Sequence, residues 1–269
     1  MQRFTRAGLT FPVVDDGPSD GPPVVLLHGF PQSPAAFDLV TPRLHDAGLR
    51  TLAPTQRGYA ASARPRRRRD YAVGETAADV LALLDAAGLE RVHLVGHDWG
   101  AAPVWQLAAT APDRVLTATV LSTPHPRAMS AALLHGQARR SWYMAFFQLP
   151  VLPERRARRS LGGALAGSGL PERFVGEYTA ALAAPGAATG ALNWYRGLPF
   201  SRPAAGPARV PTTYVWGRHD FALGRWAAER TADHIAPGVA YRFLEVDAGH
   251  WLPETAPEAI ADAIIDRTG

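Results

Sequence analysis

The chain contains no cysteine, and all 28 of its Lys and Arg residues are arginine, so lysine is absent too. Without cysteine there are no disulfide bonds and no thiolate metal sites. The missing lysine, together with heavy use of Ala, Pro and Gly, indicates the codon bias of a GC-rich genome rather than a function. No apolar run is long enough to span a bilayer, and residues 1–6 lack the apolar stretch of a signal peptide. We therefore expect a cytoplasmic protein without a membrane segment.

A net charge of +4 raises the question of a nucleic-acid partner. The densest cluster of arginines is the run Arg64–Arg69, and smaller clusters lie at Arg139–Arg140 and Arg155–Arg159. No aromatic residue interleaves the first cluster, and no nucleic-acid-binding motif accompanies any of them. We interpret the clusters as solvated surface and expect no nucleic-acid partner. A docking patch for an acidic carrier protein or an anionic substrate is the alternative.

Apolar runs of strand length alternate with helical periods along most of the chain. A strand or hairpin is expected at residues 5–14, strands at residues 24–27, 50–54, 91–95, 115–121, 210–217 and 241–246, and helices at residues 34–47, 74–87 and 101–110. This alternation is typical of a parallel sheet with helices on both faces. Residues 124–207 show no strand period and are rich in Ala, Leu and Arg, so we predict an inserted helical cap there. The core domain is then formed by residues 1–123 and 208–269.

Residues 96–100 read Gly-His-Asp-Trp-Gly and lie between a predicted buried strand and a predicted helix. This arrangement is typical of a nucleophile elbow, whose flanking glycines leave room for a sharp turn. Serine is the commoner nucleophile, but this chain has Asp98. A carboxylate that attacks a saturated carbon forms an alkyl ester, which activated water can hydrolyse, whereas serine would form an ether that water cannot open. Asp98 therefore indicates an epoxide or an alkyl halide as substrate. The alternative is a structural or capping aspartate.

Such a nucleophile needs a base, and the base needs an acid that orients it. Behind an elbow of this kind the order along the chain is nucleophile, acid, histidine. Asp220 and His250 each lie just past the C-terminal end of a predicted strand, which is the edge of an open α/β sheet where ligands bind. We predict a triad of Asp98 as nucleophile, Asp220 as acid and His250 as base. Asp247 and His219 are neighbouring alternatives for the last two roles, and we rank them lower.

A buried strand is also expected just before residues 28–31, which read His-Gly-Phe-Pro. This loop commonly supplies one backbone N–H donor to an oxyanion, and the residue after the nucleophile supplies the second. The predicted donors are therefore the backbone N–H groups of Phe30 and Trp99. We interpret His28 as a structural hydrogen-bonding residue behind the loop. The bond before Pro31 is a candidate cis peptide.

Two aromatic strings stand out in the predicted cap. Residues 141–148 read Ser-Trp-Tyr-Met-Ala-Phe-Phe-Gln, and residues 192–196 read Leu-Asn-Trp-Tyr-Arg. One interpretation is that these side chains only pack against the core. The other is that two tyrosine hydroxyls point at the nucleophile, because the leaving oxygen of an epoxide stays attached and develops alkoxide charge that a phenol stabilises. The chemistry alone leaves both interpretations open.

Together these motifs resemble the epoxide hydrolases of the α/β-hydrolase superfamily over nearly the whole chain. The resemblance implies a mostly parallel eight-stranded sheet flanked by helices, with an inserted helical cap. It also implies that Tyr143 and Tyr195 are the ring-opening tyrosines, and we expect Trp142 and Trp194 beside them to shape the substrate pocket. Residues 57–60, Arg-Gly-Tyr-Ala, are similar to the family's Arg-Gly-Tyr-Gly loop, whose last glycine is replaced here.

The predicted function is hydrolysis of an epoxide to a vicinal diol, with the epoxide and water as partners, no cofactor or metal, and a homodimer left open. Haloalkane dehalogenases also use an aspartate followed by tryptophan, but often carry an asparagine where this chain has Phe30. Haloacetate (haloacid) dehalogenases carry an arginine after the nucleophile, where this chain has Trp99. A catalytically silent hydrolase fold that binds a partner is the third alternative, and the intact set of Asp98, Asp220 and His250 argues against it.

Overall fold

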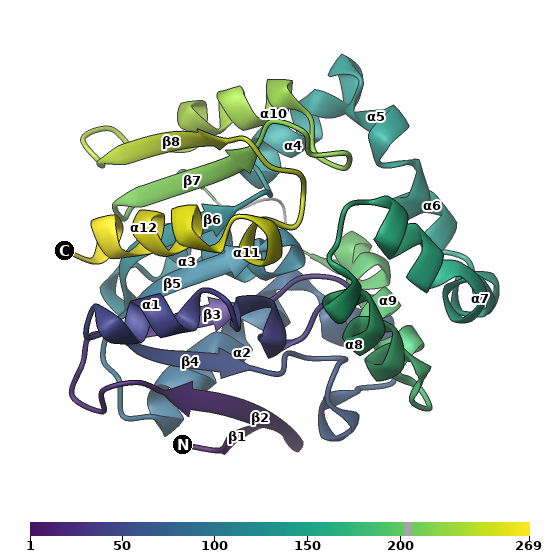
Figure 1. The fold of residues 1–269 in the computed structure, drawn as a ribbon, viewed down its shortest axis with the longest axis horizontal. Helices are drawn as coiled ribbons and strands as arrows, with labels where there is room; N and C mark the ends of the chain where they lie inside the picture. The colour runs from purple at the N-terminus through teal and green to yellow at the C-terminus, as the bar shows by residue number, and fades with distance from the viewer. Residues whose placement is uncertain (202–205) are drawn as a thin grey trace.

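A computed structural model describes residues 1–201 and 206–269 as an eight-stranded sheet flanked by helices (Figure 1). The strands are β1 (Arg3–Arg6), β2 (Leu9–Asp16), β3 (Pro23–Leu27), β4 (Arg50–Pro54), β5 (Val92–His97), β6 (Val115–Leu121), β7 (Thr212–Gly217) and β8 (Tyr241–Val246). Their order across the sheet is β1-β2-β4-β3-β5-β6-β7-β8. The pairs β1–β2 and β2–β4 are antiparallel, and the other pairs are parallel. The fold class expected from the sequence is confirmed.

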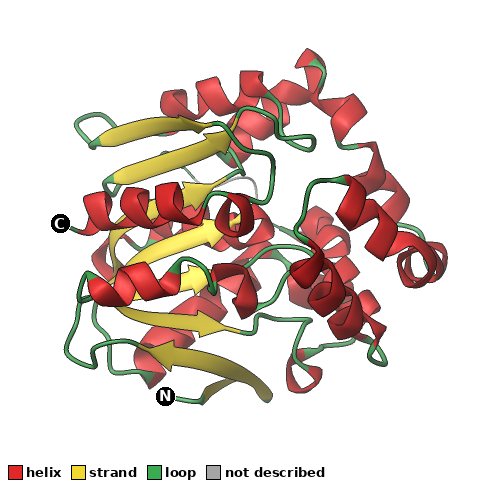
Figure 2. Cartoon of the chain, viewed as in Figure 1, coloured by secondary structure: helices red, strands yellow, loops and turns green. Residues whose placement is uncertain are grey.

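Helices cover both faces of this sheet, as the layers in Figure 2 show. They are α1 (Thr41–Asp46), α2 (Val73–Ala86), α3 (Ala101–Thr110), α10 (Arg225–Arg230), α11 (Leu252–Thr255) and α12 (Pro257–Thr268). Successive side chains of a strand point to opposite faces, so each buried strand feeds two cores. Along β3, Val24 and Leu26 join the cluster that includes α1 and α12, whereas Val25 and Leu27 join the cluster that includes α2 and α3.

The helix expected at residues 34–47 is divided in the structure, which corrects the prediction. A 3-10 turn spans Pro34–Phe37, and α1 begins only at Thr41. The physical reason is Pro42, which has no N–H to donate to the carbonyl that lies four residues earlier in a continuous helix. Proline is tolerated in the first turn of a helix, so α1 begins just before it.

The segment between β6 and β7 is helical and lies beyond the arrowheads of the parallel strands (Figure 1). Its helices are α4 (Pro126–Ala132), α5 (Gln137–Arg140), α6 (Trp142–Phe147), α7 (Leu152–Gly167), α8 (Glu172–Ala183) and α9 (Ala187–Gly197). Residues 124–201 and 206–207 contain no strand. Residues 202–205 of the predicted cap lie outside the described residues. The division into a core and a cap stays a prediction, and we use the word cap below for α4–α9.

Cap and core are joined by specific hydrogen bonds as well as by apolar packing. The indole Nε1–H of Trp194 donates to the carbonyl of Arg57 at 2.6 Å, and Arg64 donates to the carbonyl of Pro185 at 2.9 Å.

In the described part of the chain, no helix is both long and apolar enough to cross a membrane.

Candidate active site

Asp98 lies where β5 turns into a short 3-10 turn (Asp98–Gly100) and then into α3. Its φ of 50° is in the left-handed region, which costs a non-glycine residue on the order of 1 kcal/mol and marks a constrained turn. The two flanking glycines explain how the turn closes. A Cβ on Gly96 would collide with the carbonyl of Gly100, and a Cβ on Gly100 would collide with the carbonyl of Leu27. The elbow therefore packs directly against the end of β3.

The structure brings the three residues of the predicted triad together. His250 Nδ1 lies 2.8 Å from Asp220 Oδ2, and His250 Nε2 lies 3.5 Å from Asp98 Oδ2. The other oxygen of Asp220 accepts the backbone N–H groups of Ala222 and Leu223 at 2.7 and 2.9 Å. Those two bonds fix the carboxylate of Asp220, and Asp220 in turn orients the imidazole of His250 toward the elbow.

The buried charges of the three residues shift one another's pKa. Burial alone would lower the pKa of His250, but the carboxylates of Asp220 and Asp98 outweigh it and raise this pKa to about 10. Burial would raise the pKa of Asp98, but the hydrogen bond and charge of His250, with the N–H of Phe30, outweigh it and lower this pKa. In the resting site an ionised Asp98 therefore faces a protonated His250.

The loop after β3 contacts the carboxylate of Asp98 directly. The backbone N–H of Phe30 donates to Asp98 Oδ1 at 2.7 Å, and the Phe30–Pro31 peptide bond is cis, as expected. His28 is buried behind the loop, and its Nδ1 lies 3.0 Å from the carbonyl of Gly29. His28 thus contacts the loop from behind, and its structural role stays a prediction.

A cavity of about 310 Å³ opens over Asp98 between the core and the cap. It is lined by Val73, Asp98, Trp99, Ala102, Trp105, Gln106, Thr123, Pro124, Pro126, Met129, Ser130, Tyr143, Met144, Tyr195, Leu198, Ser201 and Leu223. Among these described lining residues, Asp98 carries the single charged side chain. The cavity therefore suits an uncharged, largely apolar ligand.

Both predicted tyrosines face this cavity from the cap. Tyr143 comes from α6 and Tyr195 from α9, and their ring centroids are 6.0 Å apart. The ring of Tyr195 also packs edge-on against Trp99 at 4.7 Å. Burial, together with the charge of Asp98, raises the pKa of both phenols, so both stay protonated hydrogen-bond donors at neutral and moderately alkaline pH.

The structure does not bring the two predicted tryptophans into the cavity, which corrects that expectation. Trp142 is 64% exposed, because consecutive residues of a helix point about 100° apart and Tyr143 takes the inward direction. Trp194 is buried, but it packs behind the cavity wall against Trp99 and Tyr59. Although Trp194 is next to Tyr195 in the sequence, it lies on a different face of α9.

The lower-ranked alternatives for acid and base lie outside the site. His219 and Asp247 contact each other at 2.9 Å on the exposed surface.

The loop at residues 57–60 is ordinary despite its missing glycine, since Ala60 is extended at φ −70° and ψ 138°. Arg57 in that loop is buried and forms two hydrogen bonds to the carboxylate of Asp79 at 2.6 and 2.7 Å. In the described residues no group of three or more His, Cys, Asp or Glu side chains is arranged to hold a metal ion.

Comparison with known proteins assigns the family. A family model described as the alpha/beta hydrolase fold matches residues 22–257. The chain belongs to the α/β-hydrolase family. It is 35% identical to the AB hydrolase superfamily protein YfhM of Bacillus subtilis (strain 168), over 96% of this chain and 94% of that protein. It is 32% identical to Epoxide hydrolase A of Mycobacterium tuberculosis, over 96% of this chain and 94% of that one.

Solved structures agree with the sequence relatives. Epoxide Hydrolase A from Mycobacterium thermoresistibile superposes with a TM-score of 0.80 at 29% identity, covering 98% of this chain and 96% of the other. A structure titled as one of novel epoxide hydrolases from metagenomes of hot environments superposes with a TM-score of 0.86 at 28% identity, covering 99% and 97%. The resemblance to epoxide hydrolases seen in the sequence motifs is confirmed.

Behind the triad, this α/β-hydrolase contains a buried polar network that the sequence analysis missed. Glu254 Oε1 accepts hydrogen bonds from Gln32 Nε2 at 2.7 Å and from the hydroxyl of Tyr178 at 2.8 Å. Gln32 Oε1 accepts the N–H of Gly29 and contacts His97, which in turn contacts the carbonyl of His250 at 2.8 Å. The network therefore ties together the loop after β3, the elbow and the loop that contains His250.

The carboxyl of Glu254 gives this α/β-hydrolase a specific dependence of stability on pH. Burial raises its pKa from 4.5 to about 7, since the hydrogen bonds from Gln32 and Tyr178 do not offset the cost of burying its charge. The folded protein binds this proton more tightly than the unfolded chain, so this contribution to stability is lost as the pH rises from about 4.5 through 7.

We expect Glu254→Gln to remove this pH dependence of the free energy of unfolding. For a pKa of Glu254 raised from 4.5 to about 7, its full size is roughly 3 kcal/mol. Urea unfolding of both proteins at pH 5, 6, 7 and 8 should give a variant whose stability relative to wild type increases with pH. The cost of burying an amide does not change with pH, so the slope alone reports the ionisation of Glu254. Parallel stability curves would show that Glu254 titrates normally.

Proposed function

We propose that this chain hydrolyses an uncharged epoxide to a vicinal diol through an ester on Asp98. Its similarity to Epoxide hydrolase A, at 32% identity over nearly the whole chain, supports epoxide hydrolysis as the activity. One contact carries the ester route: the N–H of Phe30 holds Asp98 Oδ1 at 2.7 Å, while Oδ2 lies on the side of His250. One oxygen thus already has the donor that an oxyanion needs, and the other is left to attack.

In the first half-reaction, Asp98 Oδ2 attacks a ring carbon and the bond from that carbon to the epoxide oxygen breaks. The alkoxide that forms takes a proton from Tyr143 or Tyr195, which both line the cavity. Esterification removes the negative charge of Asp98, and with it part of what raises the pKa of His250. His250 then loses its proton, which restores the tyrosine, and becomes a neutral base.

In the second half-reaction, His250 takes a proton from water, and the resulting hydroxide attacks the carboxyl carbon of the ester. Charge develops on Oδ1, where the N–H of Phe30 already points, and we assign the backbone N–H of Trp99 as the second donor. The bond between the carboxyl carbon and Oδ2 breaks, the departing alkoxide takes the proton of the added hydroxyl group, and the diol leaves. The proton that His250 took from water stays on it, so the resting charge state returns.

The lining of the cavity argues against the dehalogenase alternatives. A haloacid needs a cation for its carboxylate, and among the described residues that line the cavity there is no arginine or histidine. A halide leaves as a stable anion and needs no proton, whereas the oxygen of an opening epoxide becomes an alkoxide that takes a proton from a phenol. Tyr143 and Tyr195 therefore favour the epoxide.

The test is a single-turnover reaction with styrene oxide in 18O-labelled water, read by mass spectrometry. The proposal predicts unlabelled diol on the first turnover, with one 18O entering the peptide that contains Asp98. Label in the first diol would mean that water attacks the ring directly with Asp98 as a base, and would overturn the ester. Release of halide from a haloalkane, with no diol from any epoxide, would assign the chain to the dehalogenases.

A further inference from the structure

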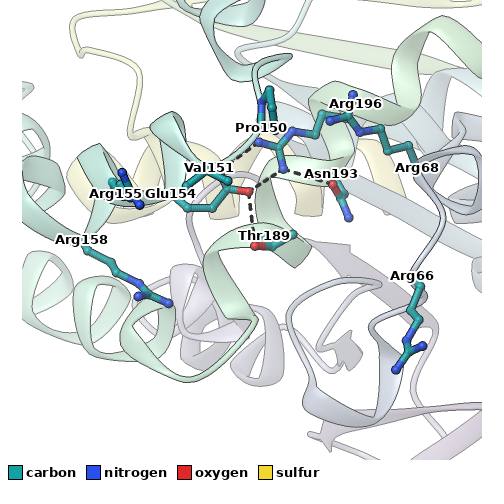
Figure 3. A pocket seen from close by; sticks show the side chains of 10 residues that line it. All are labelled: Arg66, Arg68, Pro150, Val151, Glu154, Arg155, Arg158, Thr189, Asn193 and Arg196. Atoms are coloured by element: carbon teal, nitrogen blue, oxygen red, sulfur yellow. Dashed lines mark hydrogen bonds and ion pairs between the residues drawn. The ribbon is translucent and has the colours of Figure 1, made fainter.

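A second cavity, of about 490 Å³, lies between the cap and the loop that joins β4 to α2 (Figure 3). It is lined by Arg66, Arg68, Pro150, Val151, Glu154, Arg155, Arg158, Thr189, Asn193 and Arg196. It shares no lining residue with the cavity above Asp98. Its size is within the range of small-molecule binding sites. Unlike the active-site cavity, its lining is dominated by positive charge.

The arginine at the floor of this cavity is already neutralised. Arg196 is buried and pairs with Glu154 at 2.6 Å, and it also donates to the carbonyls of Phe147 and Leu149. Glu154 accepts a further hydrogen bond from Thr189 at 3.3 Å. This satisfied pair leaves the net charge of the cavity to the other four arginines.

Those four arginines flank the cavity in two pairs, as Figure 3 shows. Arg155 and Arg158 come from α7 on the cap, and Arg66 and Arg68 come from the core. Within the described residues, none of the four guanidinium groups forms an ion pair or a hydrogen bond with another side chain. Four unneutralised cations around one concave surface repel each other and concentrate a positive potential there.

The spacing within the pair on α7 matches the local backbone. Residues three apart on a helix share a face, which brings Arg155 and Arg158 to the cavity and turns Arg156 and Arg159 away from it. On the core side, Arg66 and Arg68 both line the cavity, and Arg68 extends toward Arg196 whereas Arg66 extends away from it (Figure 3). Of the ten arginines in these two runs and at the floor, five line the cavity.

We propose that this cavity binds the di- or triphosphate group of a soluble small molecule. A guanidinium binds phosphate oxygens through two parallel N–H donors, and four of them balance the three to four negative charges of such a group better than they balance a single carboxylate. The ligand would bridge core and cap on the side of α9 opposite to Tyr195. Binding of this phosphate group is independent of the reaction that Asp98 performs.

The arginine run Arg64–Arg69 is then more than solvated surface. Arg64 points inward and donates to the carbonyls of Gly58 and Tyr59 at 3.0 and 2.6 Å. Arg66 and Arg68 line the cavity, and the remaining two positions do not. One run of like residues thus divides into a structural residue, a binding pair and a solvated pair.

The test is titration calorimetry of the full chain with inorganic triphosphate at 0.15 M salt. We expect saturable one-to-one binding with a Kd below about 100 µM. The variants Arg155→Gln/Arg158→Gln and Arg66→Gln/Arg68→Gln should each weaken binding at least tenfold. The matched variants Arg156→Gln/Arg159→Gln and Arg67→Gln/Arg69→Gln remove the same charge from the same segments and should change Kd less than twofold.

Three results would overturn the proposal. Wild type that shows no saturable binding has no such site. Equal losses in the cavity variants and the matched variants would mean that only the overall charge attracts the anion. In the third result, the wild-type protein sediments with vesicles of anionic phospholipid, loses this in the two cavity variants, and fails to bind soluble triphosphate. That result would assign the arginines to a lipid surface. Melting curves of all four variants establish that each is folded, and all the changed side chains are exposed, so we expect them to fold.

Discussion

His250→Gln is expected to stop the reaction after a single half-reaction and to leave the substrate attached to Asp98. In the proposed first half-reaction Asp98 attacks the epoxide without needing a neutral base, but glutamine cannot take a proton from water, so the ester should persist. Steady-state turnover should fall by roughly 10⁴ or more. Intact-protein mass spectrometry should show a mass increase equal to one epoxide, and peptide mapping should place it on Asp98.

The chain contains a matched control for this experiment. His219 also contacts an aspartate, Asp247 at 2.9 Å, but this pair is exposed and remote from the elbow. His219→Gln should keep full turnover and form no adduct. If His250→Gln loses turnover without accumulating the ester, then His250 acts before or during ring opening, and its assignment as the base for water would be wrong.

The double variant Tyr143→Phe/Tyr195→Phe is expected to lower kcat/KM by about 10³, within the range known for general acids. Both phenols line the cavity with Asp98, and each single variant leaves one donor in place, so single changes should cost less than the double change. In the double variant, no phenol gives its proton to the epoxide oxygen as the bond from that oxygen to the ring carbon breaks. The fall should occur in the first half-reaction, which rapid mixing in the His250→Gln background measures as the rate of ester formation.

Trp142→Phe is the control for the tyrosine variants. Trp142 precedes Tyr143 on α6 and is also aromatic, but it is 64% exposed and does not line the cavity. It should leave ester formation unchanged. If the double tyrosine variant forms the ester at the wild-type rate, the phenols only pack around the substrate, and the proton for the alkoxide has another source.

The parts of the site that were predictable are those tied to strand ends. Asp98, Asp220 and His250 each follow a strand, and parallel strands bring their carboxyl ends to one edge of the sheet, so distant sequence positions converge. The order of the three residues along the chain indicated their roles, and the two glycines that flank Asp98 indicated the elbow. The helix expected at residues 34–47 failed because helical periodicity of apolar residues persisted across a proline that interrupts the backbone hydrogen bonds.

The missed parts depend on packing across elements. Trp142 and Tyr143 are neighbours in the sequence, but the orientation of α6 decides which of them faces Asp98, and periodicity alone does not give that orientation. The partners of Glu254 are Gln32 and Tyr178, which are separated from it by 222 and 76 residues. The available signal for this network was one carboxyl, Glu254, in the otherwise apolar segment that follows His250, and its partners could not be read from spacing.

The hydrogen bond from Phe30 to Asp98 makes two chemically identical oxygens unequal. In the proposed cycle, Oδ1 is held by the backbone and never bonds to the substrate. Oδ2 leaves with each diol, and an oxygen from water takes its place on the side of His250. In that proposed cycle Asp98 is a reagent that is partly consumed and renewed each time. The proposal implies that, after many turnovers, one of its oxygens is still the atom incorporated during synthesis, and the other has been supplied by the most recent water molecule.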